Sequence, residues 1–170
     1  LGLPPELIAG VPVDPRAVGD GLDVVTIQGH VDPPSVIAAI EQAEQRHPDG
    51  RVAISLVPTQ LTHLVDDPRC AAALARCAAV LVGGAPPTAA LLERARDRGI
   101  AATVTYGMSE TCGGCVYDGV PLEGARVDLA DDGRVRIAGP MIMRGYLDEG
   151  QVGAWLPTQP LGQVEDGRVD

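Results

Sequence analysis

Short β-branched runs alternate with helix-forming segments between residues 51 and 105, and this alternation constrains the fold more than any other feature. The runs at 51–57, 79–82 and 101–105 have the length of buried strands. Proline suits the first turn of a helix, where the missing N–H costs nothing. Segments that open near proline predict helices at 58–65, 68–78 and 88–97. Strands that alternate with helices indicate an α/β fold with parallel βαβ layers, which place ligand sites beyond the carboxyl ends of the strands.

Upstream of this region the sequence predicts one further strand and one further helix. The β-branched run at 22–27 is typical of a short strand. Asp32 is a suitable N-cap for a helix over 33–46, because its side chain can accept a hydrogen bond from the first turn. Pro33 and Pro34 would occupy that turn.

After residue 116 the pattern changes to that of antiparallel strands. The runs at 126–129 and 134–137 flank Ala-Asp-Asp-Gly at 130–133, which predicts a hairpin with an Asp-Gly turn. We therefore expect an α/β pocket-forming subdomain at 1–115, followed by a small β-rich subdomain at 116–170.

The charge of the chain argues against two classes of partner. The formal net charge is −10 and the sequence contains no lysine. Nucleic acids and anionic membranes bind basic patches, so we expect neither as a partner. No apolar run approaches the roughly 20 residues of a membrane span, and the first residues lack the pattern of a secretory signal. A cytoplasmic protein is expected.

Two pairs of cysteines need separate interpretations. Cys70 and Cys77 lie in an Ala-rich segment, where a helix would put both on one face, and we expect them to be small core residues. Cys112 and Cys115 have the spacing of half a zinc site or of a redox pair. No second ligand pair lies nearby, and the histidines are scattered at His30, His47 and His63. Both metal and redox chemistry are therefore disfavoured.

The segment with the clearest chemical content is Thr-Tyr-Gly-Met-Ser-Glu-Thr at 105–111. Hydroxyls and backbone N–H groups at Ser109 and Thr111 can hold phosphate or carboxylate oxygens. Glu110 offers a hard oxygen ligand of the kind that Mg²⁺ prefers, and Tyr106 offers a face for stacking. The plainer interpretation of the same residues is a tight turn after a strand, with Glu110 in solvent.

This segment resembles the nucleotide-site motif of the adenylate-forming superfamily of acyl-CoA ligases and luciferases. Gly-Gly-Ala-Pro at 83–86 is similar to a loop of that family, and Cys-Gly-Gly-Cys-Val-Tyr-Asp-Gly at 112–119 resembles the bacterial o-succinylbenzoate–CoA ligases. The resemblance implies that Tyr106 stacks on adenine, that Ser109 and Thr111 contact phosphate, and that Glu110 binds magnesium. It also implies an acyl pocket between 83–86 and the segment after Thr111, lined by the Cys112–Cys115 region.

Other positions depart from the family pattern. The family's phosphate-binding loop ends in Pro-Lys-Gly, which has no counterpart here. Glu6 and Leu7 stand where the family has an aromatic residue and a histidine. Gln159 and Pro160 stand where it has Gly-Asp, and that Asp binds the ribose hydroxyls. These differences put ATP use in doubt.

The retained and missing motifs together favour a shortened descendant that keeps the acyl pocket and needs no cofactor. It would act on a small-molecule carboxylic acid or acyl thioester by proton transfer, as an isomerase, lyase or cyclase. Glu110 is the first candidate for the general acid/base, Tyr106 and Ser109 are orienting groups, and His30 is an outside candidate in an ordinary capping loop. The expected pocket residues are Gly83, Gly84, Ala85, Pro86, Gly107, Thr111, Gly113, Gly114, Cys115, Tyr117 and Asp118.

Two alternatives stay open. The first is a fragment or split half of an ATP-dependent acyl-CoA ligase, which would use ATP and hold Mg²⁺ through Glu110. ATP–pyrophosphate exchange with o-succinylbenzoate-like acids would distinguish it. The second is a non-catalytic module that binds an acyl ligand. A sheet edge left open by the lost subdomain would favour a homodimer or another homo-oligomer.

Overall fold

The computed structural model describes residues 23–27, 29–147, 150–151, 153–161, 164–165 and 168–169. The chain forms two compact units that divide between Val104 and Thr105. The predicted subdomain boundary at 115/116 stays a prediction. The elements of the first unit are α2 (Pro33–Arg46), β1 (Ala53–Leu56), α3 (Pro58–Asp66), α4 (Pro68–Leu74), β2 (Ala79–Val82), α5 (Ala89–Asp97) and the start of β3 (Ala102–Met108).

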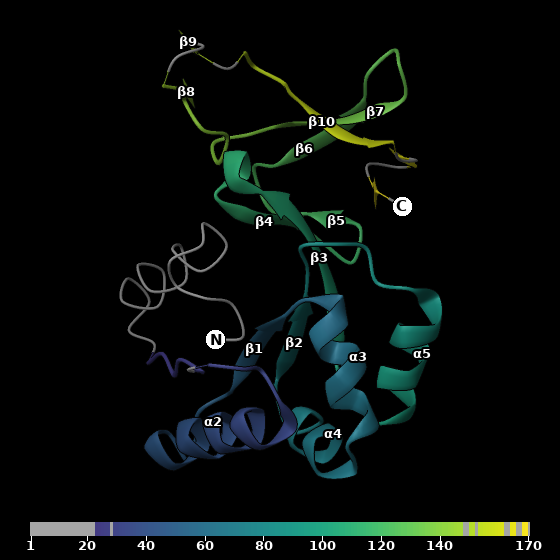
Figure 1. Ribbon diagram of the computed structural model, residues 1–170. Helices are drawn as coiled ribbons and strands as arrows, with labels where there is room; N and C mark the ends of the chain where they lie inside the picture. The colour runs from purple at the N-terminus through teal and green to yellow at the C-terminus, as the bar shows by residue number, and fades with distance from the viewer. Residues whose placement is uncertain are drawn as a thin grey trace. The chain divides into compact units, whose positions relative to one another are not determined.

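Parallel strands form the centre of the first unit and confirm the predicted α/β fold. Ile54 of β1 pairs with Val80 of β2, and Val82 of β2 pairs with Val104 of β3, both in parallel register. Helices α2 to α5 gather around β1 and β2 (Figure 1). The strands carry aliphatic side chains inward, as expected where helices cover a parallel sheet. The buried cluster includes Val36, Ile40, Leu56, Leu61, Leu64, Leu74, Val80 and Val82.

Local hydrogen bonds fix where the helices of this unit begin. Asp32 Oδ1 accepts from the Ser35 N–H at 2.9 Å, and Ser35 Oγ accepts from the Asp32 N–H at 3.0 Å. This reciprocal capping box starts α2 where the sequence predicts it. Asp67 caps α4 through the Cys70 N–H at 2.8 Å, and Thr88 caps α5.

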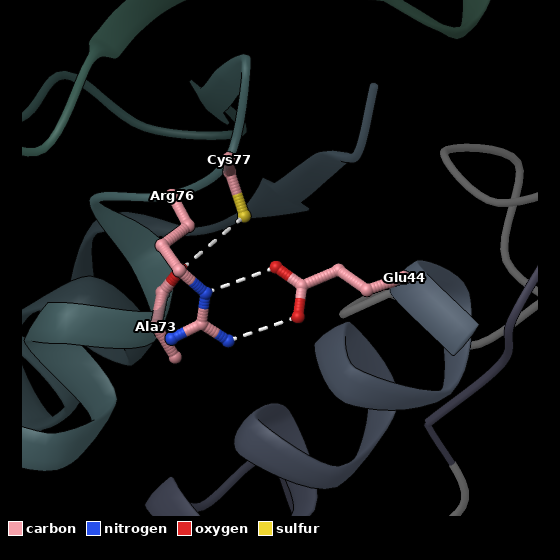
Figure 2. A network of polar contacts seen from close by, with 4 residues as sticks. All are labelled: Glu44, Ala73, Arg76 and Cys77. Atoms are coloured by element: carbon pink, nitrogen blue, oxygen red, sulfur yellow. Dashed lines mark hydrogen bonds and ion pairs between the residues drawn. The ribbon is translucent and has the colours of Figure 1, made fainter. Parts of the chain in front are cut away.

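An ion pair joins α2 to the segment that follows α4. Both guanidinium nitrogens Nε and Nη2 of Arg76 donate to Glu44, each at 3.0 Å. Figure 2 shows this bidentate ion pair beside Cys77, whose Sγ lies 3.8 Å from the Ala73 carbonyl oxygen. Two parallel N–H···O bonds fix the geometry of this contact in addition to the attraction between the two charges.

Three local predictions differ from the structure. Residues 23–27 of the predicted 22–27 strand form no strand, because β-branched residues favour a strand only where the surrounding structure provides a regular ladder. Helix α4 ends at Leu74, so Cys77 is buried beside Cys70 without sharing its helix. The helix predicted at 88–97 begins at Ala89, because Thr88 provides the N-cap, and Pro86 and Pro87 lie before it.

The second unit is built from antiparallel strands. The last residues of β3 are followed by the turn η1 (Ser109–Thr111) and by β4 (Gly113–Tyr117), β5 (Val120–Pro121), β6 (Arg126–Leu129), β7 (Arg134–Ala138), β8 (Gly145–Tyr146), β9 (Gly150–Gln151), β10 (Leu156–Leu161), β11 (Val164–Glu165) and β12 (Arg168–Val169). Strands β6 and β7 confirm the predicted hairpin, and β10 pairs with the other side of β7. A small cluster of Cys115, Val116, Val135 and Ile137 forms the buried core.

Candidate functional site

Thr111 holds the turn of the motif together from the inside. Its side chain is buried, and its Oγ1 accepts from the Met108 N–H at 2.9 Å. The same oxygen lies 2.7 Å from the Gly113 carbonyl oxygen and 3.1 Å from that of Met108. A hydroxyl has one proton, so the shorter contact identifies Gly113 as its acceptor. The hydroxyl is therefore engaged by the backbone of the turn, and the phosphate contact predicted for Thr111 stays a prediction.

Glu110 lies in the same turn and is held by a residue that the sequence analysis did not single out. Its carboxylate Oε1 accepts from the Tyr146 hydroxyl at 2.7 Å, and its backbone carbonyl accepts from the Met143 N–H at 2.8 Å. Glu110 is half-buried, while Ser109 beside it is exposed. The 36-residue separation hides this contact, and the only available signal was that Tyr146 is one of three tyrosines in an aromatic-poor chain.

Tyr106 and Gly107 lie within β3, where they pair with β4. The Tyr106 hydroxyl oxygen is buried without a hydrogen-bond partner among the described residues. Burial raises the pKa of Tyr106; Thr158 lies near enough to oppose that rise, although it does not reach hydrogen-bond geometry. Gly107 is required sterically, since a Cβ there would lie 2.0 Å from the Gly113 carbonyl oxygen. The strand bulges between these two residues, which changes the register before the turn.

The remaining candidate residues of the second unit lie on β4 and its following turn. Gly114 lets the Tyr117 ring approach, because a Cβ there would come within 3.0 Å of the tyrosine hydroxyl. Cys115 is buried, and burial raises the pKa of its thiol. Asp118 has a φ of 48° and Gly119 a φ of 77°, as a two-residue hairpin turn requires. The structure thus brings residues 106–118 together in one unit.

Gly83, Gly84, Ala85 and Pro86 lie in the first unit, at the carboxyl ends of β1 and β2, as the alternation of elements predicts. The Gly83 N–H donates to the Leu56 carbonyl at 3.1 Å, so the loop continues the pairing of the two strands. Gly84 has a φ of 83°, a conformation that glycine adopts without strain. A pocket that joins this loop to residues 106–115 of the second unit stays a prediction. His30 is exposed, and its carbonyl accepts from Ser35 Oγ in the capping loop of α2.

The cysteines and acidic residues form no metal centre in the described part of the chain. No group of three or more His, Cys, Asp or Glu side chains there is arranged to hold an ion. Cys112 is exposed and Cys115 buried. Burial raises the pKa of both Cys70 and Cys77 to about 11, in keeping with their predicted place in the core. Within the described ranges, no helix is long and apolar enough to cross a membrane.

Comparison with known proteins identifies the class to which this fold and motif belong. The family model described as AMP-binding enzyme matches residues 17–147, so the chain belongs to that family. The resemblance to the adenylate-forming superfamily is thereby confirmed. Relatives that match nearly the whole chain include 2-succinylbenzoate–CoA ligases. The chain is 40% identical to a probable 2-succinylbenzoate–CoA ligase of Mycobacterium tuberculosis, over 98% of this chain and 44% of that protein. It is 30% identical to the enzyme of Bacillus pumilus, over 98% of this chain and 38% of that protein.

Solved structures give the same assignment. The unliganded o-succinylbenzoate coenzyme A synthetase of Bacillus subtilis matches with a TM-score of 0.83 and 25% identity, over 99% of this chain and 40% of that one. The same enzyme in complex with its acyl-adenylate intermediate matches with a TM-score of 0.80 and 25% identity, covering 99% of this chain and 39% of that chain. This chain thus spans less than half the length of these relatives. None of the comparisons supports a repurposed isomerase, lyase or cyclase, and they favour the ligase alternative instead.

Proposed function

We propose that this chain forms the acyl-adenylate-binding part of an ATP-dependent acyl-CoA ligase that acts on 2-succinylbenzoate or a similar aromatic dicarboxylic acid. The observation that carries the proposal is the 40% identity to the mycobacterial ligase across 98% of the chain. A Bacillus subtilis relative has been solved with its acyl-adenylate intermediate, which supports a small-molecule carboxylic acid as the ligand. Homodimer formation and a cytoplasmic location remain predictions.

The proposed reaction has two balanced steps. The acid carboxylate attacks the α-phosphorus of ATP, which forms the acyl-adenylate and releases pyrophosphate. The thiolate of coenzyme A then attacks the acyl carbon, which forms the thioester and releases AMP. Tyr106 and the loop at 83–86 are the proposed adenine and acyl contacts, and the exposed Ser109 is a proposed phosphate contact.

The residues present also fit a magnesium ion bound together with ATP. Mg²⁺ is held in such sites by one or two carboxylates together with substrate phosphates, so a cluster of three protein ligands is unnecessary. Glu110 supplies one half-buried carboxylate. Tyr146 engages its Oε1, and its Oε2 has no partner among the described residues. The ion would neutralise phosphate charge as it develops during adenylation.

Pro160 sets a limit on the expected nucleotide affinity. It stands where the resemblance places the ribose-binding Asp, and a proline side chain cannot accept hydrogen bonds from ribose hydroxyls. We therefore expect the acyl group to contribute more to affinity than the nucleoside does, and we expect the adenylate to bind more tightly than either half alone.

Isothermal titration calorimetry with a stable sulfamoyl analogue of 2-succinylbenzoyl-adenylate tests this proposal. The analogue should bind at least about 10-fold more tightly than either 2-succinylbenzoate or AMP, because one molecule then joins both sets of contacts. ATP–pyrophosphate exchange with the acid, measured on the same preparation, would extend the result to catalysis. Equal affinity for the free acid and the adenylate would contradict nucleotide use and restore the ATP-independent interpretation.

A further inference from the structure

We infer that Tyr146 is a positioning residue for Glu110, which its hydroxyl holds in the orientation needed to face a nucleotide-bound divalent cation. The inference rests on the proposed function. It starts from two contacts that one short segment makes with the same residue: the Tyr146 hydroxyl to Glu110 Oε1 at 2.7 Å, and the Met143 N–H to the Glu110 carbonyl at 2.8 Å. Both the backbone and the carboxylate of Glu110 are therefore fixed by residues 143–146.

The turn itself does not fix the Glu110 side chain. Its three residues form a single 3₁₀ turn, and Thr111 uses its hydroxyl on the backbone of Met108 and Gly113. A glutamate side chain has three rotatable bonds, so an unrestrained carboxylate would lose considerable conformational entropy on binding a ligand. The hydrogen bond from the Tyr146 hydroxyl orders the Glu110 side chain in the folded protein before any ligand binds, so less entropy is lost on binding.

Because the hydrogen-bond donor is a neutral phenol, the Glu110 carboxylate keeps the negative charge that a cation would bind. Among the described residues, Glu110 forms no salt bridge, so its negative charge is not neutralised by arginine. The neutral Tyr146 hydroxyl binds Oε1 without neutralising the carboxylate. The same hydrogen bond fixes the orientation of the carboxylate and therefore of Oε2. A guanidinium in that place would instead compete with the metal for both oxygens.

The exposure of Tyr146 argues that its hydroxyl matters more than its ring. The residue remains 48% exposed on β8, so its ring contributes less burial than a core tyrosine would. Leu147, the next residue, lies in the turn after β8, is fully exposed and supplies a control beside Tyr146. Replacing Tyr146 by phenylalanine removes the donor while keeping the ring.

The test compares ATP dissociation constants with excess Mg²⁺ and with EDTA, by calorimetry, for the unsubstituted chain and three variants. The ratio of the two constants isolates the metal-dependent part of the affinity. We expect Glu110→Gln to bring the ratio near one. Tyr146→Phe should reduce it about 5-fold or more, the order expected when the ligand must itself order a glutamate side chain. Leu147→Ala should leave the ratio unchanged.

The outcomes separate this role from a structural one and from the proposed function. If the hydroxyl only ties β8 to the turn, Tyr146→Phe will lower the unfolding midpoint and weaken ATP binding equally with and without Mg²⁺; that result overturns the inference. If Glu110→Gln abolishes the metal dependence and Tyr146→Phe does not change it, the inference is overturned while the proposed function stands. If the unsubstituted chain shows no Mg²⁺-dependent affinity, the proposed function fails, and the role of Tyr146 fails with it.

Discussion

The two units of this chain obtain their structure in different ways. The first is built on a large buried cluster of aliphatic residues, with helices that start at local capping bonds. The second has a small core. Parts of its backbone are held by single hydrogen bonds between residues far apart in the sequence, such as Thr158 Oγ1 to the Val135 carbonyl at 2.6 Å. The motif of the candidate site lies in the second. Its geometry is therefore specified by individual hydrogen bonds more than by packing.

The difference can be measured because each unit has its own spectroscopic signal. Helices α2 to α5 all lie in the first unit, so the circular dichroism at 222 nm reports on it. The single Trp of the chain, Trp155, lies in the second unit. Two guanidinium groups lie over its ring, Arg136 at 4.8 Å and Arg126 at 5.4 Å from the centroid, so its fluorescence should respond to loss of that sheet.

The largest effect is expected from a cavity in the first unit. Leu64→Ala removes a fully buried side chain of α3 and should lower the free energy of unfolding by about 3 kcal/mol, through lost transfer energy and residual cavity. Urea unfolding followed at 222 nm would measure it. Thr59→Ala, at an exposed position of the same helix, should change the same quantity by less than about 0.5 kcal/mol. An equal shift of the Trp155 transition in Leu64→Ala would show that the units unfold together and that the comparison is wrong.

A smaller effect is expected from deleting one hydroxyl in the second unit. Thr111→Val keeps the shape of the side chain but leaves the Met108 N–H and the Gly113 carbonyl without their buried partner. We expect about 2 kcal/mol of destabilisation in the Trp155 fluorescence transition, the cost of unsatisfied buried groups. Thr111→Ser should restore most of it. A change in Thr111→Val below about 0.5 kcal/mol would mean that packing, and not the hydroxyl, shapes the turn.

The same division explains what the sequence could predict. In the first unit, prolines, the Asp32 cap and β-branched runs act over a few residues, so the helices and the parallel strands could be read directly. The errors there were the strand predicted at 22–27, of which residues 23–27 form no strand, and a helix that ends before Cys77. Both depend on neighbours that local patterns do not contain.

In the second unit the candidate site could be located but not completed. The motif at 105–111 could be located from residue types alone, and a tight turn within it was the plainer of the two interpretations. The donor that holds Glu110 did not, because Tyr146 is brought to it only by the path of the chain through β4 to β8. The pairing of Tyr106 with β4 was also missed, since nothing local shows that β3 continues through the motif. Long-range polar contacts leave no periodic pattern in the sequence from which they could be predicted.

The smallest predicted effect tests whether polar contacts matter little in the first unit. The Arg76 guanidinium holds the pKa of Glu44 below its ordinary value of 4.5. The unfolded chain therefore binds the proton first as pH falls, so the stabilisation is complete above about pH 4.5 and is lost as pH drops through the lower native pKa. The pair is more than a third exposed, and solvent limits its contribution to about 0.5 kcal/mol. Glu44→Gln should cost that amount at pH 6 and progressively less as the pH falls below about 4.5, measured by urea unfolding at 222 nm. Glu93→Gln, an exposed position on α5, controls for the change in net charge. A cost above about 2 kcal/mol at pH 6, or one that grows toward acid pH, would show that the first unit also depends on single polar contacts.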